Sequence, residues 1–218
     1  MDDFDLKTDS KMYAYVEKHT ALVKESLCQL ERDTHVNVLG SRMISGAYQG
    51  KFLELLSQMI QPFSILEVGT YTGYSAICLA SGLRLKGKLI TLEHNEELKD
   101  RILKYVENAG YREKIELRIV EALPHLQSMQ EENFDLIFLD ADKENYLNYY
   151  PLLLNKLRIG GWLLIDNVLW SGKVYESAYK DKITEILRKF NDNIQMDSNV
   201  ENIMLPFRDG LSLLRRLR

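Results

Sequence analysis

The amino-acid sequence predicts an α/β protein with a doubly wound, Rossmann-like sheet of seven strands, mostly parallel and with an antiparallel last strand. Short apolar runs with few internal charges predict strands that are buried on both faces. They cover residues 64–68, 89–92, 115–119, 134–139 and 162–165. Helical stretches separate these runs, and this alternation is typical of parallel strands joined by right-handed crossovers. The last two strand-like runs, 194–199 and 211–216, are joined by a turn-rich stretch without a helix, which predicts the antiparallel last strand.

Apolar residues at helical spacing predict the helices. They cover residues 11–30, 47–60, 74–85, 96–108, 123–129 and 145–157. The first of them precedes the first strand, so we expect an N-terminal helical extension over residues 1–46. The chain shows no internal repeat and no Gly/Ser linker, and its 218 residues fit a single domain spanning 1–218.

Composition and charge exclude several classes of protein. Hydrophobic residues make up 45% of the chain and charged residues 28%, which excludes disorder, collagen and disulfide scaffolds. The net charge of −4 gives no general attraction to nucleic acid, so we expect no nucleic-acid partner. Cys28 and Cys78 lie far apart, and we expect two buried thiols in a reducing compartment. The first ten residues lack a signal-peptide pattern and no apolar run reaches about 18 residues, so we expect a cytoplasmic protein without a membrane span.

A glycine turn follows the first predicted strand. Gly69 and Gly73 are spaced GxxxG, which does not match the GxGxxG fingerprint of dinucleotide-binding proteins. The carboxylate of Glu67 beside this turn would repel a phosphate but would suit a cationic ligand. Glu93 closes the second strand, where an acid can bind a ribose diol. Together these residues indicate S-adenosylmethionine; a purely structural strand–helix turn is the alternative.

Polar side chains also end the fourth and fifth predicted strands. Asp140 comes directly after residue 139, and Asp166 and Asn167 follow residue 165. If the two strands are neighbours, these side chains converge at one edge of the sheet and offer three oxygen ligands, which suit a hard cation such as Mg²⁺. The alternative is that they only cap helices and turns.

Lys143 lies three residues after Asp140 in the same loop. A bound cation nearby would lower the pKa of this lysine, so that a neutral amine could accept a proton as a general base. The alternative is an ordinary solvated lysine.

Four segments carry a resemblance to a known family: LEVGTYTGYS, LDADKENYLNYY, DNVLWSGKV and LPFRDGLSLLRR, in this order. Over residues 13–216 the chain resembles the cation-dependent O-methyltransferases of the caffeoyl-CoA/catechol type, which are class I enzymes dependent on S-adenosylmethionine. The resemblance implies this cofactor and a divalent cation, Mg²⁺ first, with Ca²⁺ or Mn²⁺ as alternatives. It implies that Asp140, Asp166 and Asn167 are the metal ligands, and that Lys143 is the general base with Asp140 as the second catalytic residue.

The same resemblance implies a set of cofactor contacts spread over the chain: Met43, Ser45, Glu67, Gly69, Thr70, Ser75, Glu93, Ala122, Asp140 and Tyr149. Residues 42–52 match the segment that covers the cofactor, so the extension over 1–46 would supply a lid and part of the substrate wall. Three positions depart from the family's pattern. Val120 and Arg208 stand where small residues are common, and Ser45 stands where Thr or another small residue occurs.

The resemblance implies transfer of a methyl group to one hydroxyl of a catechol-like (vicinal diphenol) small molecule by a homodimer. Trp170 could form a wall for an aromatic substrate, or it could simply pack in the core. One alternative keeps the metal site and methylates a hydroxyuridine in tRNA, against which the net charge of −4 argues. A non-catalytic sensor of an adenosine ligand is a further alternative, and the glycine spacing argues against a nicotinamide oxidoreductase.

Overall fold

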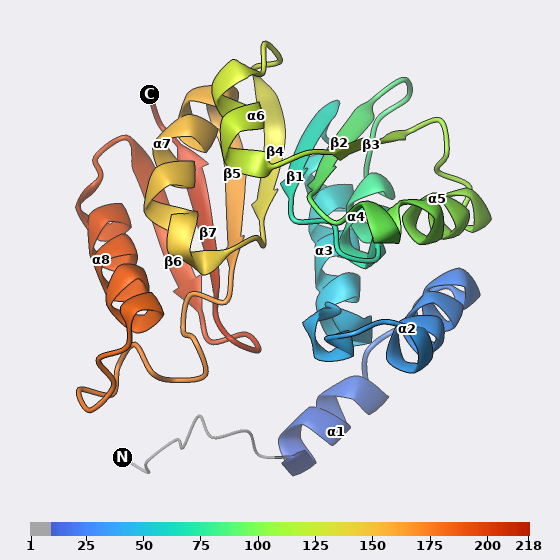
Figure 1. The fold of residues 1–218 in the computed structure, drawn as a ribbon, viewed down its shortest axis with the longest axis horizontal. Coiled ribbons are helices and arrows are strands. Elements are labelled where there is room, and N and C mark those ends of the chain that lie inside the picture. The colour runs from blue at the N-terminus through green and yellow to red at the C-terminus, as the bar shows by residue number, and fades with distance from the viewer. Residues whose placement is uncertain (1–9) are drawn as a thin grey trace.

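The computed structural model describes residues 10–218, so the first nine residues of the predicted extension lie outside it. Its strands form one sheet in the order β3-β2-β1-β4-β5-β7-β6, with β7 antiparallel to both neighbours and β1 to β5 parallel to one another (Figure 1). The strands are β1 (Ser64–Val68), β2 (Lys88–Glu93), β3 (Ile115–Ile119), β4 (Phe134–Leu139), β5 (Leu157–Asp166), β6 (Val200–Leu205) and β7 (Leu211–Arg216). This arrangement confirms the predicted fold class.

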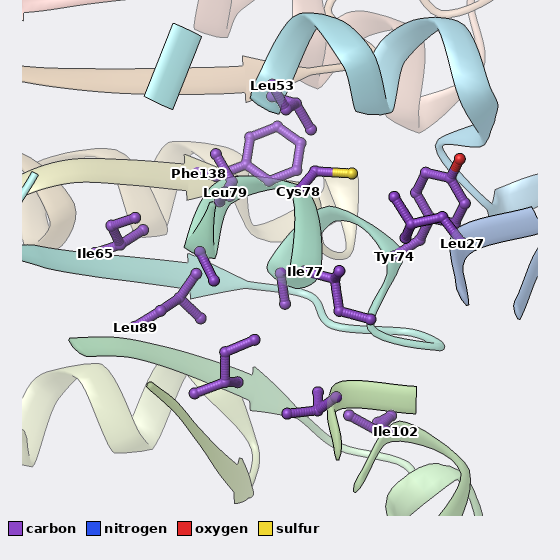
Figure 2. Close-up of a cluster of buried hydrophobic side chains, with 14 of the residues drawn as sticks. Leu27, Leu53, Ile65, Tyr74, Ile77, Cys78, Leu79, Leu89, Ile102 and Phe138 are labelled. Atoms are coloured by element: carbon purple, nitrogen blue, oxygen red, sulfur yellow. The ribbon is translucent and has the colours of Figure 1, made fainter. Parts of the chain in front are cut away.

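Helices cover both faces of the sheet. The helices are α1 (Ser10–Lys18), α2 (Glu25–Asn37), α3 (Gly46–Ile60), α4 (Tyr74–Ala80), α5 (Lys99–Asn108), α6 (Ala122–Ser128), α7 (Tyr146–Lys156) and α8 (Lys182–Met196), with 3₁₀ turns η1 (Ser41–Met43), η2 (Glu96–Leu98) and η3 (Lys143–Asn145). Side chains alternate across a strand, and so Ile65 packs with α2 to α5 whereas Leu66 packs with α6 to α8. Figure 2 shows the first of these clusters, in which Leu53 of α3 and Phe138 of β4 meet Leu79 of α4.

The predicted helix over 11–30 is wrong as a single helix. The chain forms α1, breaks after Lys18, and resumes helix at Glu25, continuing to Asn37. At the break, the Thr20 hydroxyl donates 2.7 Å to the carbonyl of Val16, and Lys24 has extended backbone angles. The next large apolar residue after Val16 is Leu22, six residues on, so the helical spacing of apolar residues is interrupted where α1 ends.

The predicted strand over 194–199 is also wrong. Residues Lys182–Met196 form α8, a helix that the sequence prediction omitted, and the strand begins only at Val200. Leu187, Phe190 and Ile194 are buried at helical spacing, so Ile194 belongs to a helix face. The sequence does contain one signal for this helix, the N-cap residue Asp181 at its start. Asp181 accepts a 3.2 Å hydrogen bond from the backbone N–H of Thr184.

Three smaller differences concern lengths and burial. Helix α4 ends at Ala80 and not at residue 85, and β5 starts at Leu157, before the two glycines that interrupt its apolar pattern. Cys78 is buried as expected, but Cys28 is exposed because it lies on the outer face of α2.

Within the described part of the chain, no helix combines the length and the apolar composition needed to cross a bilayer.

Candidate active site

The strand order reverses between β1 and β4, and this switch point lies beside the glycine turn. In open parallel sheets, ligands bind outside the carboxyl ends of the strands at such a point. Gly69 follows β1 with φ +99°, and a Cβ placed on it would lie 2.0 Å from the carbonyl oxygen of Asp140, which follows β4. Only glycine permits this close approach of the two loops.

A cavity of about 1960 Å³ opens at this edge of the sheet. Its walls are the loops after β1 to β5, the turn between β6 and β7, and the segment before α3. All the predicted site residues except Glu67 line it: Met43, Ser45, Gly69, Thr70, Ser75, Glu93, Ala122, Asp140, Lys143, Tyr149, Asp166 and Asn167. The fold therefore brings these residues, distant in sequence, to one place.

Glu67 lies fully buried inside β1 and does not line the cavity. Its Oε2 accepts 2.5 Å from the hydroxyl of Thr91, which in turn lies 2.5 Å from the hydroxyl of Thr70 in the cavity wall. Burial raises the pKa of Glu67 to about 8, although Ser75 and Thr91 favour its charged form. Among the described residues, none donates to Oε1 with hydrogen-bond geometry, so this buried oxygen lacks a donor.

Glu93 ends β2 with a carboxylate that is already held in place. Its Oε2 accepts 2.7 Å from the backbone N–H of Tyr71, and Oε1 accepts 2.9 Å from that of Asn95. These bonds orient the side chain at the wall of the cavity. Each oxygen keeps a further lone pair, which a diol could use.

Asp140 and Asp166 stand side by side because their strands are neighbours in register, with Leu139 opposite Ile165. Burial, and then the charge of Asp140, raise the pKa of Asp166 to about 6. The repulsion between two neighbouring carboxylates favours the binding of a cation between them. Asn167 comes one residue later with φ +58°, a conformation that asparagine tolerates better than most residues.

Lys143 points its ammonium group back at Asp140. Nζ donates 2.8 Å to Oδ1 of Asp140 and 3.0 Å to the carbonyl of Ala141. Burial alone would lower the pKa of Lys143, but Tyr146 and Asp140 outweigh it and raise the pKa above its ordinary value. Burial raises the pKa of Tyr146 as well, so its phenol is neutral near pH 7 and Asp140 supplies the charge that keeps Lys143 protonated. The sequence analysis expected a bound cation to lower the pKa of Lys143. When Asp140 has no other cationic partner, the pKa of Lys143 is instead raised.

A family model described as O-methyltransferase matches residues 17–217. The chain belongs to this O-methyltransferase family. A caffeoyl-CoA O-methyltransferase of Petroselinum crispum is 33% identical over 228 residues, covering 97% of this chain and 92% of the relative.

Solved structures agree with this assignment. The SAH-bound methyltransferase PaMTH1 of Podospora anserina has a TM-score of 0.89 and 25% identity, covering 100% of this chain and 99% of that one. An O-methyltransferase from Bacillus cereus in complex with SAH has a TM-score of 0.86 and 31% identity, covering 94% and 97%. The protein is therefore an O-methyltransferase that uses S-adenosylmethionine.

The site of this O-methyltransferase fits the cofactor. S-Adenosylmethionine carries a positive ammonium and a positive sulfonium, and the buried oxygen of Glu67 has no donor among the described residues. A cationic donor near it would remove the cost of a buried unpaired acceptor. The absence of a phosphate-binding glycine loop agrees with a cofactor that has no phosphate.

The donor set of the methyltransferase also fits a hard cation. In the described part of the chain, no three His, Cys, Asp or Glu side chains gather into a metal site. A cation here would instead be held by the carboxylates of Asp140 and Asp166, the amide oxygen of Asn167, and oxygens from water or substrate. Such an all-oxygen set with open positions is typical of Mg²⁺.

The sequence analysis did not predict two contacts of the site, that of Gln49 with Asp166 and that of Arg208 with Gln49. Gln49 of α3 is 1% exposed, and its Nε2 donates 2.7 Å to Oδ2 of Asp166. Nη1 of Arg208 donates to Oε1 of Gln49 and to the carbonyl of Ser45. No local sequence signal announces contacts between residues more than 110 positions apart. Arg208 was noted only as a departure from the family's pattern.

Two aromatic residues of the prediction, Tyr149 and Trp170, both line the cavity. Tyr149 lines the cavity, but its hydroxyl donates 2.6 Å to Oδ1 of Asp142, so Asp142 serves to hold this tyrosine. Trp170 also lines the cavity, and among the described residues none accepts a hydrogen bond from its buried Nε1. Its ring nevertheless contributes aromatic surface to the cavity wall.

Proposed function

We propose that this methyltransferase depends on a divalent cation and methylates one hydroxyl of a catechol-like small molecule. The observation that carries the proposal is the placement of Asp140, Asp166 and Lys143 around one cavity that the predicted cofactor residues other than Glu67 also line. Two neighbouring carboxylates and a lysine at the end of a sheet give both a cation site and a proton acceptor.

The size and lining of the cavity support a two-molecule site. Its volume of about 1960 Å³ exceeds the roughly 300–1,000 Å³ of an ordinary ligand pocket. A cofactor and an aromatic substrate therefore both have room. Trp170 and Tyr175 add aromatic surface to the wall that also contains Asn167.

The residues of the chain have separate roles in this proposal. S-Adenosylmethionine supplies the methyl group, and a cation at Asp140, Asp166 and Asn167 supplies positive charge beside the substrate oxygen. Nζ of Lys143, held by Asp140 and the carbonyl of Ala141, takes the proton of the hydroxyl that is methylated. The walls of the cavity align the oxygen with the methyl group. Such alignment can lower a barrier by roughly 7–11 kcal/mol relative to free encounter.

The proposal is tested by turnover of isotopically labelled S-adenosylmethionine with a panel of vicinal diphenols and matched monophenols. Each is measured with Mg²⁺ and with excess chelator, and products are located by mass spectrometry. We expect one methyl group on one of two neighbouring hydroxyls, and loss of turnover with chelator. Equal turnover with chelator contradicts the cation, and equal turnover of monophenols contradicts the diphenol substrate.

A tRNA hydroxyuridine as substrate is the alternative outcome. It is tested by adding to the same assay tRNA that carries the hydroxyuridine without its methyl group. The net charge of −4 makes it the less favoured one, since binding of nucleic acid rests largely on basic groups. The homodimer and the cytoplasmic location stay predictions of the sequence.

A further inference from the structure

The side-chain amide of Gln49 is fixed in one orientation by two unlike neighbours. Oε1 accepts from Arg208, and Nε2 donates 2.7 Å to Oδ2 of Asp166. A guanidinium has only donors and a carboxylate only acceptors. A rotation of the amide by 180° would therefore break both bonds. Arg208 thus determines that Gln49 presents a donor to Asp166.

The same guanidinium holds the segment in front of α3. Nη1 of Arg208 donates to the carbonyl of Ser45, and Nη2 donates 3.4 Å to the carbonyl of Ile44. Met43 and Ser45 of this segment line the cavity. Arg208 comes from the turn between β6 and β7, so it bridges two walls of the cavity from different parts of the chain.

Asp166 is the end of this chain of contacts. It is 4% exposed, and its Oδ1 accepts 2.8 Å from the backbone N–H of Asn167 while Oδ2 accepts from Gln49. With both oxygens held by protein donors, the carboxylate cannot rotate without loss of a bond. Partners of this kind orient a ligand and typically alter metal affinity by 10- to 100-fold when they are removed.

We infer that Arg208 and Gln49 are positioning residues that couple the segment 43–45 to Asp166. The Ser45 carbonyl accepts from Arg208, Arg208 orients Gln49, and Gln49 orients Asp166, so a cofactor that holds the segment 43–45 in this position also holds Asp166. Cofactor and cation therefore strengthen each other's binding, and the effect is reciprocal because the coupling is one free energy. The inference rests on the proposed function in one respect, namely that Asp166 binds the cation.

The test measures Mn²⁺ binding by the loss of the free-ion signal in electron paramagnetic resonance, without and with saturating S-adenosylhomocysteine, which cannot react. For the wild type we expect Mn²⁺ to bind at least about 5-fold more tightly when S-adenosylhomocysteine is present. Calorimetry of S-adenosylhomocysteine, without and with Mn²⁺, should give the same factor.

Two variants separate the two contacts. Gln49→Met keeps the length of the side chain but removes both bonds, so we expect Mn²⁺ affinity to fall about 10-fold or more and S-adenosylhomocysteine alone to bind nearly as before. Arg208→Gly removes the bridge at a position with φ +51°, which glycine adopts readily. We expect this variant to fold at least as well as the wild type and yet to lose the coupling, with both ligands showing the same affinity alone and together.

Arg216→Ala is the matched control. Nη1 of Arg216 also donates to backbone carbonyls, those of Leu154 at 2.8 Å and Leu157, but outside the residues that line the cavity. We expect it to keep the wild-type coupling whatever its melting temperature. Wild-type coupling in Arg208→Gly overturns the inference and leaves the proposed function intact. Absence of Mn²⁺ binding by the wild type overturns both.

Discussion

Nζ of Lys143 lies 2.8 Å from Oδ1 of Asp140, three residues earlier on the loop that follows β4. The carbonyl of Ala141 accepts a second hydrogen bond from the same ammonium group. The amine is thereby fixed at the wall of the cavity, next to the carboxylate proposed to bind the cation. Asp140 raises the pKa of Lys143, so the lysine becomes a proton acceptor only where another positive charge shares that carboxylate.

Replacement of Lys143 tests its role as the base. We expect Lys143→Met and Lys143→Arg both to lower kcat by about 10²–10⁴, the usual contribution of general acid–base catalysis. Arginine keeps the charge opposite Asp140 but cannot give up its proton, so its failure would separate proton transfer from simple ion pairing. Affinity for S-adenosylhomocysteine, measured by calorimetry, should stay within about 3-fold of wild type. A Lys143→Arg enzyme with wild-type kcat removes the base assignment.

Replacement of Asp166 tests the cation site separately from the cofactor. We expect Asp166→Ala to abolish the turnover that depends on Mg²⁺, because one of two charged ligands is lost, while S-adenosylhomocysteine still binds. The measurement is turnover over a range of Mg²⁺ concentrations, together with calorimetry of S-adenosylhomocysteine. Turnover that rises normally with Mg²⁺ in this variant would show that the cation is held elsewhere.

The layered fold and the gathering of the site were predictable because they follow from local pattern and topology. Strand interiors such as 136–139 are apolar on both faces, and parallel order then places Asp140 and Asp166 at one edge of the sheet. The predicted boundaries were wrong where short apolar runs were assigned to the wrong element. The helix predicted over 11–30 breaks after Lys18, where the apolar spacing is interrupted between Val16 and Leu22, and Ile194 was assigned to a strand although it is buried on a face of α8.

The supporting contacts of the site could not be predicted from the sequence. Gln49 meets Asp166 across 117 residues of chain, and Arg208 meets Gln49 across 159. Both contacts depend on how α3 and the turn between β6 and β7 settle against the sheet. The shifted pKa of Lys143 depends likewise on Asp140 and Tyr146, whose distances to the amine no spacing rule supplies.

The buried carboxyl of Glu67 predicts a specific pH dependence of stability. The folded protein without cofactor keeps the proton up to a pKa of about 8, because burial disfavours the charged form, whereas the unfolded chain releases it near 4.5. Between these values the unfolded state binds fewer protons, so wild-type stability falls as pH rises, by at most about 1.4 kcal/mol per pH unit from this group.

Glu67→Gln removes that contribution, and the comparison with wild type isolates it from other titrating groups. We expect urea unfolding to show the variant gaining stability relative to wild type from pH 5 to pH 8, whatever their difference at pH 5. We also expect weaker binding of S-adenosylhomocysteine by the variant. A stability difference that stays constant over this range would show that Glu67 is charged in the folded protein.

The contact between the loops after β1 and β4 predicts a marked difference between two glycines. A Cβ at Gly69 would lie 2.0 Å from the carbonyl oxygen of Asp140, whereas at Gly110, with φ +78°, nothing lies within 4 Å. Gly110→Ala should therefore cost only about 1–2 kcal/mol, the strain of a left-handed backbone. Gly69→Ala adds displacement of the backbone at Asp140, so we expect a larger loss of stability in urea unfolding, together with loss of turnover. Equal losses in the two variants would mean that the loops separate freely, and the cavity would then not owe its shape to this contact.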